Sequence, residues 1–227
     1  MKVIKLKSLL LILLTISFAS QAGVGLSQTR IVIEGKTNTS SITARNEDDK
    51  PFLVANFITQ QLSSKTALDG YFVITPTIFK LGPKQQNIIK IKAIPSKFPN
   101  DRESMYYFHS RNVPELDKGS DGVKVGLENV IKIFYRPANL PMEQSVAFSN
   151  IKTMSTANGV KLVNNSPYYI NLAGLYVNNK YIKLNKQNNV IAPFSEMSYS
   201  SQNKNGSVKW AIINDLGGYD EFHGTVQ

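Results

Sequence analysis

Residues 123–137 constrain the fold of this chain more than any other segment. Apolar side chains occupy every second position, interrupted once by Asn129; they are Val123, Val125, Leu127, Ile131, Ile133 and Tyr135. Because side chains alternate between the two faces of a strand, this pattern predicts one β-strand with a nearly continuous apolar row. The run of roughly 13 residues exceeds the usual strand length of about 5–6, so one half can belong to a domain core while the other serves another molecule. In the first half, Lys124, Gly126 and Glu128 alternate with the apolar residues, which suits a half-exposed strand that enters the groove of another protein.

The first 22 residues have the pattern of a secretory signal peptide. Lysine-containing residues 1–8 precede the apolar run 9–16, and the small residues Ser20 and Ala22 suit cleavage after Ala22. The apolar run is short for a bilayer span, which disfavours the alternative of an amino-terminal membrane anchor. No later stretch is long and apolar enough to span a bilayer, so we expect a mature chain outside the cytoplasm without membrane insertion.

Charge and cysteine content exclude several classes of function. The formal net charge is +10, and loss of Lys2, Lys5 and Lys7 with the signal peptide lowers it to +7. No nucleic-acid-binding motif accompanies this charge, so we expect no nucleic-acid partner and only a weak tendency toward acidic proteins or anionic surfaces. The chain has no cysteine, which excludes disulfides, thiol catalysis and thiolate metal sites.

The remaining residues predict an all-β protein of two immunoglobulin-like sandwich domains. In the first block, strands are expected within 26–34, 41–46, 52–59, 71–75, 87–93 and 105–110, with a proline-bounded edge segment at 76–83, before the long strand. In the second block, strands are expected at 160–163, 168–176, 194–199, 208–214 and 222–226. Two prolines within 137–142 suggest a stiff connector, so we divide the chain into a signal peptide at 1–22 and domains at 23–141 and 142–227.

Signals for an enzyme are weak. His109 and His223 lie beside no recognisable nucleophile and have no metal-ligand spacing, so both are expected to be structural. Asp215 and Glu221 are two carboxylates that a glycan hydrolase could use, but their spacing alone is poor evidence. No phosphate-binding glycine loop is present. We expect no catalytic residue, no metal and no cofactor.

Five segments together resemble the periplasmic chaperones of the chaperone/usher pathway for pili, in the order and spacing of that family. They are residues 29–35 (TRIVIEG), 101–108 (DRESMYYF), 131–137 (IKIFYRP), 165–169 (NSPYY) and 213–218 (INDLGG). The resemblance covers essentially the whole mature chain. It implies two immunoglobulin-like domains in an L or boomerang arrangement, binding incomplete pilus subunits in the periplasm and passing them to an outer-membrane usher.

The resemblance also implies roles for the long strand and for a basic pair. Val123, Val125 and Leu127 match the apolar residues that the family lends to the open groove of a subunit, together with main-chain hydrogen bonds. Arg30 and Lys132 match the basic pair that grips the terminal carboxylate of the subunit in the interdomain cleft. In a regular strand Lys132 faces away from the three apolar residues, so either the cleft lies on the other side of the strand or a bulge occurs near Asn129.

Further matches concern the hinge and the branch of the family. Glu103, Arg136 and Asp215 match an interdomain charge network that would set the angle between the domains; on their own, these residues could equally be surface ions. Segment 111–122 is short, which resembles the short-loop branch, and a cysteine pair seen in the second domain of some members is absent. Self-association of the free protein through its exposed strand is left open. The alternative hypothesis is an immunoglobulin-like structural or adhesion subunit of a surface fibre.

Overall fold

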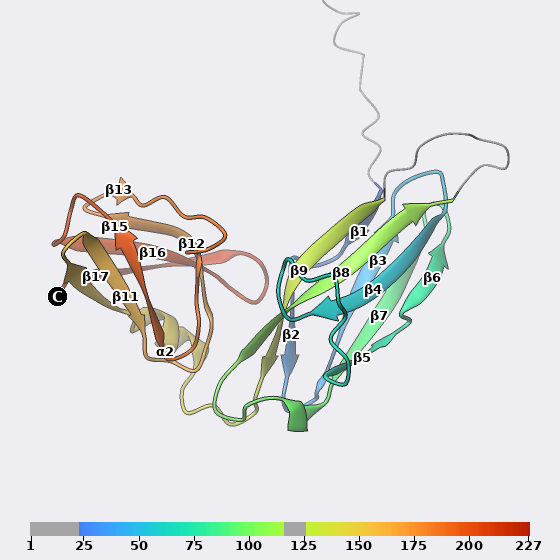
Figure 1. Cartoon of the computed structure of the whole chain (residues 1–227), viewed down its shortest axis with the longest axis horizontal. Coiled ribbons are helices and arrows are strands. Elements are labelled where there is room, and N and C mark those ends of the chain that lie inside the picture. The colour runs from blue at the N-terminus through green and yellow to red at the C-terminus, as the bar shows by residue number, and fades with distance from the viewer. Residues whose placement is uncertain (1–22, 116–125) are drawn as a thin grey trace, which may run out of the picture.

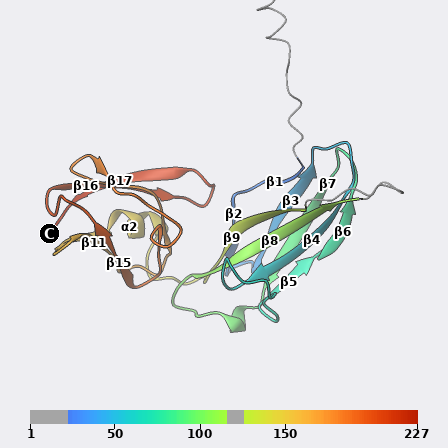
Figure 2. The same cartoon turned by 45° about the horizontal axis from the view of Figure 1, so that its top comes forward.

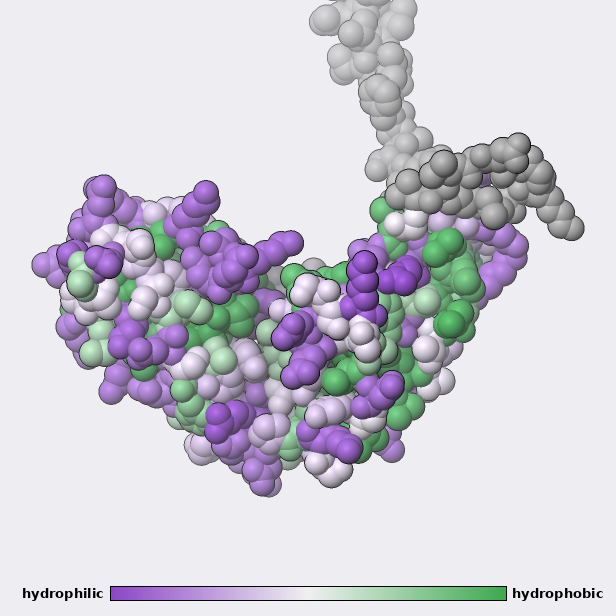
Figure 3. All heavy atoms as spheres, viewed as in Figure 1, coloured by the Kyte–Doolittle hydropathy of each residue, from purple (hydrophilic) through white to green (hydrophobic). Residues whose placement is uncertain are grey.

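The chain forms two β-sandwich domains, each with its own core (Figure 1). This computed structural model describes residues 23–115 and 126–227. The expected signal peptide, Val123 and Val125 therefore lie outside the described residues. Figures 1 and 2 show two lobes that meet at one end, and Figure 3 shows a hollow between them. The predicted all-β fold class and boomerang arrangement are confirmed.

The first domain consists of two sheets packed face to face. One sheet has the order β1-β3-β7-β5, and the other has the order β2-β9-β8-β4-β6. Their bounds are β1 Val24–Leu26, β2 Arg30–Glu34, β3 Thr39–Asn46, β4 Phe52–Thr59, β5 Phe72–Thr75, β6 Ile78–Leu81, β7 Gln86–Ala93, β8 Ser104–Pro114 and β9 Leu127–Arg136, with a 3-10 helix η1 at Pro95–Lys97. Fully buried isoleucines from both sheets, including Ile42, Ile89, Ile31 and Ile133, meet in the core because each strand turns alternate side chains inward.

The amino-terminal segment contributes to both sheets. β1 pairs antiparallel with β3, and three residues later β2 pairs in parallel with the end of β9. The side chain of Asn129 donates from Nδ2 to the carbonyl of Val24 at 2.8 Å, which explains why an asparagine interrupts the apolar row of β9. β2 covers only residues 132–136 of β9. In the described part of the chain, no strand pairs with residues 127–131 on that side, so this half of β9 is a sheet edge.

The ladder between β8 and β9 resolves the question of a bulge. Its register is constant from the pair Asn112 and Leu127 to the pair Ser104 and Tyr135. A bulge near Asn129 is therefore absent from this ladder. Lys132 lies on the opposite face of the strand from Leu127, and that face is directed at the second domain.

The second domain is a smaller sandwich. One sheet is β10-β11-β15; the other is β13-β12-β16-β17, with β14 also paired to β12. The bounds are α2 Gln144–Ser149, β10 Lys152–Thr156, β11 Gly159–Asn164, β12 Ile170–Val177, β13 Lys180–Tyr181, β14 Val190–Ile191, β15 Ser195–Ser200, β16 Ser207–Ile213 and β17 Tyr219–Thr225. Trp210 is fully buried and donates from Nε1 to the carbonyl of Phe148 in α2, so the short helix closes one end of this core.

Candidate functional site

Arg30 and Lys132 lie next to each other at the junction of the two domains. They are register partners on the parallel strands β2 and β9. Register partners on neighbouring strands point to the same face, and such strands lie about 4.8 Å apart. The sequence predicted a basic pair at these positions, and the structure brings the two residues together.

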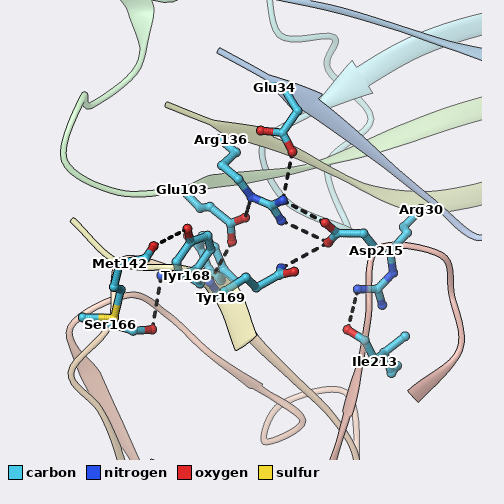
Figure 4. A network of polar contacts seen from close by, with 11 residues as sticks. Arg30, Glu34, Glu103, Arg136, Met142, Ser166, Tyr168, Tyr169, Ile213 and Asp215 are labelled. Atoms are coloured by element: carbon cyan, nitrogen blue, oxygen red, sulfur yellow. Dashed lines mark hydrogen bonds and ion pairs between the residues drawn. The ribbon is translucent and has the colours of Figure 1, made fainter. Parts of the chain in front are cut away.

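Arg30 is held by the second domain but keeps unused donors. Its side chain is buried, and Nη1 donates to the carbonyl of Ile213 at 3.0 Å (Figure 4). Nε is buried and has no hydrogen-bond partner among the described residues. Burial lowers the pKa of this guanidinium, an effect that Asp215 and Glu103 oppose. A buried donor without a partner is costly, so an acceptor that enters the site would be favoured.

Lys132 is also held from the second domain. Its ammonium group donates to Oδ1 of Asn171 at 2.7 Å. No acidic side chain among the described residues forms an ion pair with it. Burial, and then the positive charge of Arg30, lower the pKa of Lys132 to about 8. An anion between the two cations would oppose both effects, because a nearby negative charge favours the charged form of Lys132.

A second cluster lies beside this pair and is centred on Arg136 at the end of β9. Its Nε donates to Glu103 at 2.7 Å, and its terminal nitrogens donate to Asp215 at 2.8 and 3.0 Å and to Glu34 at 2.9 Å (Figure 4). Glu103 also accepts the backbone N–H of Tyr169 at 2.8 Å. The three residues expected to form a charge network are therefore in direct contact, and Glu34 joins them.

Burial and charge act in opposite directions within this cluster. Burial raises the pKa of Glu103, which Arg136 opposes. Burial would also raise the pKa of Asp215, but hydrogen bonds and charge from Arg136 hold that pKa below its ordinary value. The pKa of Arg136 is raised by the two carboxylates despite its burial. With a side-chain exposure of 2% for Glu103, 12% for Arg136 and 34% for Asp215, these residues are more than an assortment of surface ions.

Leu127 is the one predicted donor residue that the structure describes. It is 57% exposed at the start of β9, in the half of the strand that pairs with β8 but not with β2. Its face is the one that carries Ile131 and Ile133 into the core further along. The apolar row thus changes from exposed to buried along a single strand.

Candidate catalytic groups lie in structural roles. His109 is buried, shares a hydrogen bond with Thr59 at 2.9 Å and stacks on Phe57. His223 is exposed on β17. Glu221 pairs with Lys209, whereas Asp215 is bound by Arg136. Within the described residues, no group of three or more potential ligands is placed to hold a metal ion.

Comparison with known protein families identifies the family to which this two-domain chain belongs. Residues 23–141 match the family described as pili and flagellar-assembly chaperone, PapD N-terminal domain, and residues 146–223 match pili assembly chaperone PapD, C-terminal domain. The chain belongs to the PapD family of pilus-assembly chaperones. A curated relative, the probable fimbrial chaperone protein ElfD of Escherichia coli O157:H7, is 34% identical over 204 residues, covering 88% of this chain and 84% of ElfD.

Solved structures agree with the PapD-family assignment. The crystal structure of the E. coli chaperone DraB superposes with a TM-score of 0.77 at 30% identity, covering 90% of this chain and 97% of DraB. The SafB chaperone of Salmonella enterica, in complex with the SafA pilin, has the same fold, with a TM-score of 0.77 at 24% identity and coverage of 91% and 98%. The family consists of assembly chaperones, not enzymes, so the glycan-hydrolase hypothesis is wrong and the fibre-subunit alternative is not favoured.

Sequence reasoning missed one residue of the basic site. Asn171 is buried at the start of β12 and contacts Lys132 from the other domain. No local pattern identifies it, because an asparagine within the strand expected at 168–176 does not reveal that its side chain reaches a residue of the other domain. The structure has no helix, within 23–115 and 126–227, of the length and apolarity that a bilayer span requires.

Proposed function

We propose that this chaperone completes an unfinished pilus subunit with the first half of β9 and anchors the terminal carboxylate of the subunit on Arg30 and Lys132. The observation that carries this proposal is the position of the basic pair. It lies where β2 begins to cover β9, at the end of the free edge formed by residues 127–131. A strand added to that edge would end at the two cations.

This position also sets the direction of the added strand. If the carboxylate is bound at Lys132, the preceding residues of the subunit lie along β9 back toward Leu127. The added strand then runs parallel to β9. Leu127 lies five strand residues, or about 17 Å, from Lys132. Binding of the carboxylate at Lys132 therefore sets the register of the added strand along β9, and this register decides which subunit pockets receive the apolar side chains of the chaperone. Val123, Val125 and Leu127 are the side chains proposed to enter them.

The energetics suit reversible capture. Hydrogen bonds to charged groups contribute about 1.5–3 kcal/mol each, and an incoming carboxylate would use donors that the free protein leaves unpaired. Burial of aliphatic side chains adds about 1.5–3 kcal/mol for each one that is fully enclosed. Together these terms can hold a subunit while leaving it replaceable by a better-fitting strand.

The cluster of Arg136 with Glu103 and Asp215 fixes the angle between domains 23–141 and 142–227. Residues 1–22 are removed as a signal peptide, and the mature chain acts in the periplasm. Loaded chaperone delivers its subunit to an outer-membrane usher, and free chaperone can cover its exposed edge by self-association.

A capture experiment tests the central claim. Tagged chaperone is purified from the periplasm of cells that assemble the pilus, and the bound chain is identified by mass spectrometry. A pilus subunit should co-purify with the wild type and be lost from Lys132→Ala. Equal recovery with a folded Lys132→Ala variant would contradict the anchor.

A further inference from the structure

The acceptors that hold the two basic residues carry no charge. Arg30 donates to the backbone carbonyl of Ile213, and Lys132 donates to the side-chain amide oxygen of Asn171. Both acceptors belong to the second domain, on β16 and β12. Cations in proteins are more commonly held by carboxylates, and the same junction does this for Arg136.

The absence of charge on Asn171 matters because of where Lys132 lies. A carboxylate at that position would satisfy the ammonium group and also cancel its charge. An amide oxygen satisfies one donor and leaves the charge for a ligand. It also leaves Lys132 next to the like charge of Arg30. That charge lowers the pKa of Lys132, although burial lowers it more.

The orientation of the Asn171 amide follows from hydrogen-bond chemistry. A lysine ammonium has donors and no acceptor, so Oδ1 must face Lys132 and Nδ2 must face away from it. Nδ2 has no hydrogen-bond partner among the described residues. Asn171 also lines, together with Arg30, a cavity of about 10 Å³, so this residue borders both members of the basic pair.

We propose that Asn171 is the positioning residue of the carboxylate site: it holds the Lys132 ammonium group in place across the domain junction without neutralising it. This inference rests on the proposed function of Arg30 and Lys132. It adds that the site is complete only while the second domain is docked, since Asn171 and Ile213 place the two cations.

Two substitutions of nearly unchanged shape separate charge from geometry. Asn171→Asp supplies an acceptor at least as strong as the amide but adds a negative charge, whereas Asn171→Leu removes the acceptor. The matched control is Asn205→Asp, which adds the same charge to the second domain at an exposed turn. The probes are two synthetic peptides of alternating apolar and polar residues, one with a free terminal carboxylate and one with a terminal amide. About ten residues are enough to reach from the basic pair to the start of the donor segment.

The wild type and Asn205→Asp should bind the carboxylate peptide more tightly than the amide peptide. Asn171→Asp should lower affinity for the carboxylate peptide by about tenfold or more and leave affinity for the amide peptide unchanged. It should also raise the pKa of Lys132, measured by NMR titration, above the wild-type value. Asn171→Leu should reduce the carboxylate preference without raising that pKa.

Results that contradict the role of Asn171 differ from results that contradict the carboxylate anchor itself. If Asn171→Asp binds the carboxylate peptide as well as the wild type does, Asn171 is only a structural acceptor and the inference is wrong. If Lys132→Ala keeps the carboxylate preference, the anchor itself is wrong. Loss of the preference in Lys132→Ala but not in Asn171→Asp rejects this inference and leaves the proposed function standing.

Discussion

Arg30 and Lys132 are register partners on β2 and β9, so two cations that are far apart in the sequence of the first domain lie together at a buried junction. Like charges on adjacent strands are unfavourable, and burial adds to the cost. The arrangement persists because the second domain supplies an acceptor to each residue. Local unfavourable charge of this kind is typical of sites in which stability is reduced for function.

Replacement of Lys132 should separate binding from folding. Lys132→Met removes the charge and keeps most of the apolar stem. Loss of the bond to Asn171 is offset by relief of a buried charge, so the free energy of unfolding should change by less than about 1 kcal/mol. Subunit recovery from the periplasm should nevertheless fall to background. Lys90→Met on β7, in the other sheet, is the control and should retain subunit. A Lys132→Met variant that unfolds far below the wild-type midpoint would contradict the offset.

Binding and stability should respond to pH in opposite directions at Lys132. The pKa is about 8 in the folded chain and 10.5 in an unperturbed lysine. Between these values the unfolded state holds more protons, so this group makes folding more favourable as the pH rises through that window. Affinity for a carboxylate peptide should instead fall with a midpoint near the folded pKa. Among the described residues, Arg30, which stays charged, lowers the pKa of Lys132, the neutral Asn171 accepts its hydrogen bond, and Tyr107 is its register partner on β8.

Lys132→Arg provides the control for this pH dependence. An arginine remains protonated throughout the range, so the fall in affinity between pH 7 and 10 should disappear. Calorimetric titration of the wild type and of Lys132→Arg with the carboxylate peptide across that pH range measures the difference. The same fall in Lys132→Arg would assign the effect to another group.

The first domain shows how far pattern alone could reach. Strand β4 runs from Phe52 to Thr59, as the alternation and the flanking turn signals predicted. The sequence did not show that the amino-terminal segment passes from one sheet to the other. That path is determined by pairing of β1 with β3 and of β2 with the distant β9. Strand β10, at Lys152–Thr156, is a polar edge strand and was missed for lack of an apolar row.

The site was predictable only in part. Resemblance to the family indicated Arg30, Lys132 and the residues around Arg136. The strand pattern showed only that Lys132 and Leu127 face opposite sides of a regular strand, which was in conflict with a shared binding role unless the cleft lay on the other side or the strand had a bulge. The regular ladder of β8 and β9 resolved that conflict. Asn171 and the carbonyl of Ile213 could not be found from sequence, since both act through contacts between domains.

The cluster around Arg136 should contribute strongly to stability. Arg136→Met would leave the buried Glu103 without its main partner, and removal of one member of a buried ion pair costs about 3–5 kcal/mol. Urea unfolding should show a loss of this size, and small-angle scattering should show a wider range of interdomain angles. Arg45→Ala breaks an exposed pair with Glu47 at 3.6 Å and should change stability by no more than about 1 kcal/mol. Equal effects of the two substitutions would argue against a structural role for the cluster.

Leu127→Glu should impair capture without affecting the fold. The side chain is 57% exposed in the free protein, so a charge there costs little until a subunit groove has to enclose it. Enclosing an unpaired carboxylate is strongly unfavourable, and the complex should therefore form at much lower yield. Ile88→Glu is the matched control, because Ile88 is 55% exposed on β7 in the opposite sheet. Thermal unfolding of both variants should match the wild type, while subunit recovery should fall only for Leu127→Glu. Recovery that is equal for the two variants would mean that this end of β9 does not enter the subunit.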